Sequence, residues 1–146
     1  MEIVVEIPGD AVPQPRARST RGGRMYTPDN GIVAFKLAIS LLVRNEAARL
    51  RLAVSDRDAF VLEVVCVFSR PPSHLKASGE LRSTAPRFPK RVGDWDNLAK
   101  GVADAITAAG VIWKDDDQVV SGSCYKRYAS RGEPARTTIL ISSVPP

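Results

Sequence analysis

One apolar segment limits the folds that this chain of 146 residues can adopt. Residues 58–68, DAFVLEVVCVF, are rich in β-branched and aromatic side chains, and Glu63 is the only charge in their interior. Such a run favours a β-strand that is largely covered on both faces, because a strand with one face in water usually alternates apolar and polar residues. We therefore expect this segment to be the central strand of a sheet.

The segments around it predict the remaining elements. Residues 2–7 alternate apolar and charged side chains, which is typical of a strand with one face on a core. A helix is expected from a cap at Asp29 or Asn30 to about Leu50, because its broad apolar surface can pack across the sheet. A second helix is expected over residues 97–109, where apolar side chains share one face.

Two further strands are expected at residues 118–128 and 136–142, and the turn between them favours an antiparallel hairpin. The resulting fold class is α/β in the mixed α+β sense, with about four strands in a mixed sheet and two main helices. The element order is β-α-β-α-β-β, in one domain that spans residues 1–146.

The charges are unevenly distributed along the chain. Lys and Arg number 21 against 16 Asp and Glu, which gives a net charge of +5 and is common among nucleic-acid binders. Residues 10–28 form a Pro- and Gly-containing basic loop, and residues 70–92 are expected to form a long mobile loop with net positive charge. The two cysteines, Cys66 and Cys124, lie in expected strands and indicate buried thiols in a reducing compartment.

The chain has neither a signal-peptide pattern at its N-terminus nor any apolar stretch near the ~18 residues that a membrane span requires. We therefore expect a cytoplasmic protein without a membrane partner.

Acidic residues concentrate in one region of this basic chain. Carboxylates that crowd together repel one another, so such a cluster either faces solvent or is neutralised by a divalent cation. The six acids between positions 94 and 117 are Asp94, Asp96, Asp104, Asp115, Asp116 and Asp117.

The motif DWDNLAK gives this region a specific pattern. Asp94 and Asp96 point to one side if the segment is extended, and Lys100 follows Asp96 at the i,i+4 spacing, which places its ammonium beside the carboxylates on a helix. The acids at 115–117 come after a helix about 20 Å long, so the two clusters meet only if the chain doubles back along it.

Each of these features also has an ordinary structural explanation. Asp94 can cap the helix, Lys100 can form a surface ion pair, and the Asp triplet can be a solvated turn. The combination within one short region favours a metal site, however, and carboxylate oxygens suit Mg²⁺. Zinc is disfavoured because the single histidine, His74, lies in the expected mobile loop, where we expect it to be a surface residue.

The segment GDWDNLAKGVADAITAAGVIWKDDDQVV resembles the signature region of the RusA family of Holliday junction resolvases, found largely in phages and prophages. The basic segment PQPRARSTRGGRMYTP resembles N-terminal loops of that family. The resemblance implies an endodeoxyribonuclease that depends on Mg²⁺, for which Mn²⁺ can substitute, and that resolves four-way DNA junctions by paired symmetric nicks. It also implies a homodimer.

The same resemblance assigns roles to individual residues. Asp94 and Asp96 match the metal-binding acids of the motif, and Lys100 matches the lysine needed for cleavage. Asp116 matches the distal catalytic acid and third metal ligand, although the additional Asp117 leaves the register of that ligand open by one position, and Asp115 lies beside it. The basic residues expected to contact the DNA backbone, unless they are ordinary surface charges, are Arg16, Arg18, Arg21, Arg24, Lys126 and Arg127.

Two other functions are compatible with parts of the sequence. A non-catalytic DNA-binding module explains the basic charge but leaves the D-x-D-N-x-x-K motif unexplained. An Mg²⁺-dependent nucleotide phosphohydrolase explains the acids but makes little use of the basic loops. Recombination, repair and phage DNA maturation are all compatible pathways for the nuclease.

Overall fold

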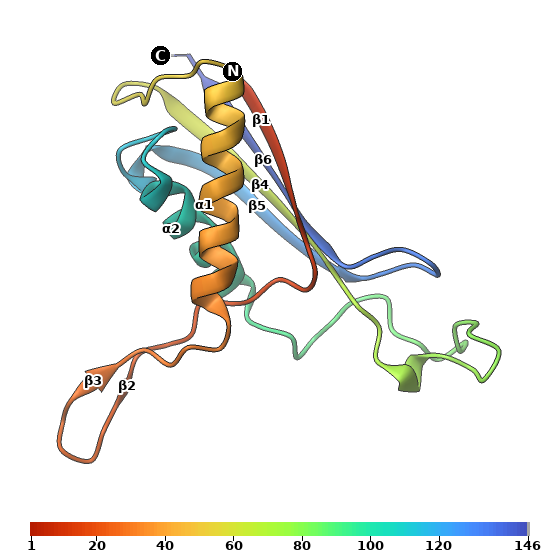
Figure 1. Ribbon diagram of the computed structural model, residues 1–146. Helices are drawn as coiled ribbons and strands as arrows, with labels where there is room; N and C mark the ends of the chain where they lie inside the picture. The colour runs from red at the N-terminus through yellow and green to blue at the C-terminus, as the bar shows by residue number, and fades with distance from the viewer. Residues whose placement is uncertain (146) are drawn as a thin grey trace.

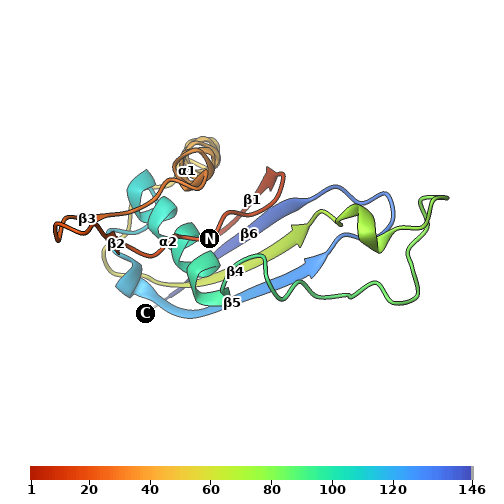
Figure 2. The ribbon, with the colours of Figure 1, turned by 90° about the horizontal axis from the view of Figure 1, so that it is seen from below.

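The computed structural model describes residues 1–145 and shows two helices on one face of a four-stranded sheet (Figures 1 and 2). This confirms the mixed α+β fold and the predicted order of its main elements. These are β1 (Glu2–Pro8), α1 (Ile32–Arg49), β4 (Ala59–Phe68), α2 (Trp95–Ala109), β5 (Val119–Tyr128) and β6 (Arg136–Val144). Short elements complete the chain: β2 (Arg18–Ser19), β3 (Met25–Tyr26) and the 3₁₀ turns η1 (Pro72–His74) and η2 (Asp116–Gln118).

The strands follow the spatial order β1-β6-β4-β5, with β5 parallel to β4 and β6 antiparallel to both β1 and β4. The predicted hairpin between the last two strands is therefore wrong, because β4 lies between them. The connection through α2 returns the chain in the same direction and places β5 parallel to β4, as in other crossover units. The largely exposed β5 suits an edge, whereas β6 buries Thr137, Ile139 and Ile141 in the interior of the sheet.

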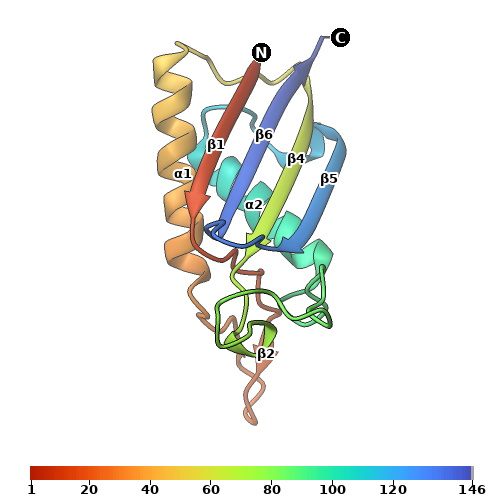
Figure 3. The same cartoon turned by 90° about the vertical axis from the view of Figure 1, so that its right-hand side faces the viewer.

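The hydrophobic core lies between the helices and one face of the sheet. Ile39 and Val43 of α1 are fully buried there, and Trp113 packs against Phe60 with ring centroids 5.4 Å apart. Figure 3 shows both helices behind the sheet, so they cover one face of β4. On the other face Glu63 is exposed, Val61 and Val65 are half-buried and Val67 is buried, so the prediction of a strand largely covered on both faces is only partly met.

The start of α1 also differs from the prediction. Its N-cap is Gly31, with φ of 96°, a left-handed conformation that glycine adopts readily. The carboxylate of Asp29 instead accepts a hydrogen bond from the Gly31 N–H at 2.9 Å, and the Asn30 amide donates to the Pro13 carbonyl at 3.2 Å. The two predicted cap residues therefore shape the turn before the helix.

Two arms leave the same end of the sheet, where α2 begins (Figures 1 and 3). Residues 10–28 form the first arm and include the small β2–β3 ladder, so this segment is not wholly a loop. Residues 70–92 form the second arm, which is irregular as predicted, yet tethered: Arg70 Nε donates to the Ala129 carbonyl at 2.7 Å. His74, predicted as a surface residue, is half-buried and packs edge-on against Tyr128 with centroids 4.9 Å apart.

Cys66 and Cys124 are free and buried on the adjacent strands β4 and β5, as predicted. Within residues 1–145, neither helix combines the length and the apolar character needed to cross a membrane.

Candidate active site

The first residue of the candidate site is Asp94, which immediately precedes α2. Its backbone carbonyl accepts from the Leu98 N–H at 3.1 Å, but in the described structure its side chain makes no capping hydrogen bond. The carboxylate is 67% exposed and lies 3.5 Å from Arg16 Nη2. Capping therefore does not account for this carboxylate, which stays accessible to a cation or to solvent.

Gly93 sets the path of the chain just before Asp94. Its φ is +122°, and a Cβ at this position would lie 2.8 Å from Pro13 Cγ, so a larger residue would collide with the first arm. The Gln14 N–H donates to the Asn97 carbonyl at 3.0 Å, and Lys126 Nζ donates to the Gly93 carbonyl at 2.7 Å. Lys126, predicted to contact DNA, thus also helps to hold the segment that carries Asp94.

Asp115 has a structural role in the turn that carries the distal acids. Its side chain accepts from the Asp117 N–H at 3.2 Å, and Gln118 completes a capping box for η2. Gln118 Nε2 also donates to the Ser55 and Asp58 carbonyls, at 3.1 and 3.0 Å, which ties the turn to the segment before β4. The Asp116 side chain has no part in this capping box.

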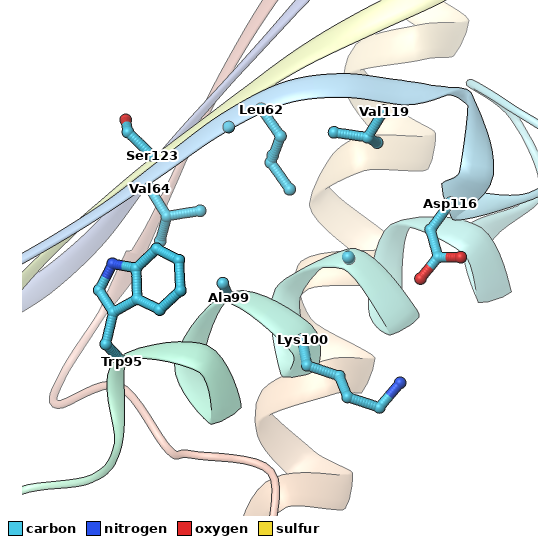
Figure 4. Close-up of a pocket in the computed structure, with 10 residues that line it drawn as sticks. Leu62, Val64, Trp95, Ala99, Lys100, Asp116, Val119 and Ser123 are labelled. Carbon is cyan, nitrogen blue, oxygen red and sulfur yellow. The ribbon is translucent and has the colours of Figure 1, made fainter.

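The distal acids do return to α2. The chain doubles back after Gly110, and Trp95 Nε1 donates to the Cys124 carbonyl of β5 at 2.8 Å. Asp116 consequently faces the middle of α2, with the Lys100 side chain directed toward it (Figure 4). A hydrogen bond that protonated Asp116 donates to the Asp115 carboxylate, burial and the negative charge of Asp115 raise the pKa of Asp116, whereas the positive charge of Lys100 opposes this shift.

Lys100 pairs with Asp104, an acid of the cluster to which the sequence had assigned no role. Its Nζ donates to Asp104 Oδ1 at 3.2 Å, and Asp104 Oδ2 accepts from Lys36 Nζ of α1, also at 3.2 Å. Among the ion pairs of residues 1–145, none joins Lys100 to Asp94 or Asp96, and its ammonium pairs with Asp104 instead. The i,i+4 geometry of a helix allows a lysine to reach either way, and Asp104 is the partner that it reaches here.

The three predicted metal ligands do not form a single cluster. Residues 1–145 contain no group of three His, Cys, Asp or Glu side chains arranged to hold a metal ion. Asp116 lies beside Lys100, whereas Asp94 opens into a separate cleft. The donor chemistry nevertheless fits Mg²⁺, which commonly takes one or two carboxylates and completes its shell with water and phosphate oxygens. The neighbouring acids that raise the pKa of Asp116 create a negative potential that also favours a cation.

The cleft beside Asp94 is basic. It has a volume of about 440 Å³, and its walls include Arg16 and Arg18 of the first arm with Lys90 and Arg91 of the second. The sequence had not singled out Lys90 or Arg91, although they belong to the positively charged segment 70–92. The cleft therefore presents cationic side chains from both arms next to an accessible carboxylate.

Arg21, Arg24 and Arg127, which were also predicted to contact DNA, are not among the residues that line this cleft. Arg21 and Arg24 are exposed on the first arm, beyond β2. Arg127 binds Glu133 through two hydrogen bonds of 2.7 and 2.6 Å, and this contact raises the pKa of Arg127 and holds that of Glu133 well below its usual range. Arg127 is thus engaged within the protein and is not brought into the cleft.

Comparison with known proteins places this arrangement in a family. The family model described as "Endodeoxyribonuclease RusA" matches residues 8–142, which includes both arms, α2 and the acids at 115–117. No curated protein matches the chain at a significant level.

Proposed function

Because the chain belongs to the RusA endodeoxyribonuclease family, and so hydrolyses phosphodiester bonds of DNA, we propose that it resolves Holliday junctions by paired symmetric nicks that depend on Mg²⁺. Junction resolution is the activity that the family implies, and divalent-metal dependence is general in it. Membership of this family disfavours both alternative functions. A non-catalytic DNA-binding module does not fit because the family is catalytic, and a nucleotide phosphohydrolase does not fit because the family acts on DNA.

The observation that carries the proposal is the return of Asp116 to the side of Lys100 (Figure 4). Their positions are separated by most of α2 and the following turn, so nothing in local sequence brings them together. We propose that Asp94, Asp96 and Asp116 hold the metal ion or ions, and because Mg²⁺ commonly takes one or two carboxylates, the three need not form a single cluster. A bound Mg²⁺ supplies neutralisation of phosphoryl charge and lowers the pKa of a water molecule.

The basic side chains have separate roles in this proposal. Lys100 places positive charge against the scissile phosphate or its leaving oxygen, where charge develops in the transition state. Asp104 acts as a positioning residue, because it holds the Lys100 ammonium and is itself held by Lys36. Arg16 and Arg18, with Lys90 and Arg91, contact phosphates and guide the strand toward Asp94.

We propose that two copies of the chain act together, because a four-way junction offers two equivalent strands. The exposed face of α1 supports this arrangement: Val33, Leu37 and Leu41 recur every four residues and are 63%, 68% and 57% exposed. A stripe of large aliphatic side chains on a solvated helix is typical of a protein interface. Two such stripes can form the self-complementary contact of a C₂ dimer.

A direct experiment tests the activity. The chain is incubated with a synthetic four-way junction, a linear duplex of the same sequence or free nucleotides, with Mg²⁺ or with a chelator. We expect paired nicks in the junction alone and only with Mg²⁺. Equal cleavage of the duplex would contradict junction selectivity, and cleavage in chelator would contradict the metal requirement.

A further inference from the structure

A second hollow, whose wall includes Trp95, lies between α2 and the edge strand β5 (Figure 4). Its volume is about 410 Å³, within the usual range for sites that bind small ligands. Lys100 and Asp116 belong to its wall, so it is continuous with the proposed catalytic groups.

The wall of this hollow is apolar except at the end where Lys100 and Asp116 lie. Leu62 and Val64 of β4 face Ala99 of α2 across it, and the Ser123 side chain lies on the opposite side of its strand (Figure 4). Trp95 closes one end, and the charges of Lys100 and Asp116 mark the other. Such a site matches a flat heterocycle that is attached to a charged backbone.

Trp95 is unusually exposed for a large apolar residue. Its side chain is large and apolar, yet the residue is 56% exposed. The hydrogen bond from Nε1 to the Cys124 carbonyl, 2.8 Å long, orients the ring and uses its only donor. The indole can therefore offer a ring face for stacking but no hydrogen bond to read a base edge.

We propose that this hollow receives one unpaired nucleobase of the DNA substrate, next to the cleaved phosphate, with Trp95 as its stacking surface. The inference rests on the proposed function and adds a contact through which the site favours some cleavage positions over others. A base costs least to remove from its stack where pairing is already weakened, as at the branch point of a junction. Recognition by stacking tolerates every base, so it selects for an unpaired nucleotide more than for a sequence.

The test fills the hollow without changing a charged residue. Ala103 of α2 lines the hollow and is half-buried, whereas Ala108 of the same helix is exposed and lies outside it. Ala103→Leu and the matched control Ala108→Leu are compared on junctions that carry 2-aminopurine at single positions around the cleavage site, in chelator so that no strand is cut. Circular dichroism confirms that each variant is folded.

We expect 2-aminopurine emission to change at one position when the wild-type chain or Ala108→Leu binds, and the change to be lost with Ala103→Leu. With Mg²⁺, Ala103→Leu should also cleave roughly tenfold more slowly, in line with the loss of one stacked base. An emission change and cleavage rate in Ala103→Leu equal to those of Ala108→Leu would overturn the inference.

A second variant keeps the test decisive if Ala103→Leu does not fold. Trp95→Ala should weaken binding to a normal junction roughly tenfold, yet leave unchanged the binding to a junction with an abasic site at the responsive position. Equal losses on the two junctions would refute a stacked base. A wild-type chain that cuts no junction would refute the proposed function itself, whereas cleavage without any emission change refutes only this inference.

Discussion

Asp104 offers a sharp test of how the site is organised, because its carboxylate holds Lys100 at 3.2 Å and is itself held by Lys36 at 3.2 Å. Asp104→Asn removes the charge and keeps the shape. Asp104 is 30% exposed and each pair is partly solvated, so the free energy of unfolding should fall by less than about 1 kcal/mol in total, and Tm by about 2–4 °C at most.

The effect on cleavage should be larger than the effect on stability. A lysine side chain that is released from its partner regains up to about 2 kcal/mol of rotamer entropy, which must be lost again in the transition state. At about 1.4 kcal/mol for each factor of ten, the variant should cleave roughly 30-fold more slowly. Single-turnover cleavage of a labelled junction in Mg²⁺ measures this rate, and thermal unfolding measures the stability.

A double variant separates a positioning role from a direct one. Lys100→Ala should slow cleavage by about 10²- to 10³-fold, as does the loss of a group that stabilises transition-state charge. If Asp104 acts only through Lys100, adding Asp104→Asn to Lys100→Ala should slow cleavage no further. A further 30-fold loss in the double variant, or a wild-type rate in Asp104→Asn alone, would refute this reasoning.

Three other outcomes follow from the same structure. Replacing Arg16 and Arg18 by Ala should weaken binding to every DNA and flatten the slope of log affinity against log salt, because phosphate contacts release counterions. An unchanged slope would mean that both arginines are ordinary surface charges. Leu37→Glu should convert a dimer of twice 15.8 kDa into a monomer in sedimentation, whereas an unchanged mass would place the interface away from the α1 stripe. Glu133 has a folded pKa depressed below its ordinary value of 4.5, chiefly by its hydrogen bond with Arg127, so it stabilises the fold above that pH and ceases to do so as pH falls. Unfolding of Glu133→Gln, followed from neutral pH into acid, should show a smaller dependence on pH than that of the wild type, and identical profiles would contradict the role of this pair.

The sequence predicted the elements better than their pairing. Periodicity and composition located both helices and the main strands, because each depends on neighbours in the chain. The position of β6 between β1 and β4 depends on which strands bury the least apolar surface and so can lie at an edge. That comparison involves segments that are far apart in the chain. The polar β5, with Gly122 and Ser123 in its middle, tolerates one edge, and β1 occupies the other.

The candidate site shows the same division. The motif made Asp94, Asp96 and Lys100 candidates because they lie on one short segment, and the triplet did the same for the distal acids. Local spacing did not reveal that Lys100 would pair with Asp104, since helix geometry allows partners in both directions. The roles proposed for Lys90 and Trp95 depend on the folded arrangement of the arm and of β5.

The structure also separates acids that the sequence treats alike. Asp115 and Asp116 are adjacent and chemically identical, but Asp115 caps η2 while Asp116 faces Lys100. Side chains of consecutive residues point in different directions from the backbone. Composition alone therefore does not distinguish Asp115, which caps the turn, from Asp116, which is accessible.

Substitution of neighbouring acids tests the central claim most directly. Asp116→Asn and Asp117→Asn each remove one exposed carboxylate from the same short turn, so both change the overall charge equally. Single-turnover cleavage of a four-way junction in Mg²⁺ should be abolished by Asp116→Asn, as by Asp94→Asn and Asp96→Asn, with junction binding retained, and should persist near the wild-type rate in Asp117→Asn. Equal cleavage by the Asp116 and Asp117 variants, or wild-type rates in any two of the variants at positions 94, 96 and 116, would contradict the proposed metal site.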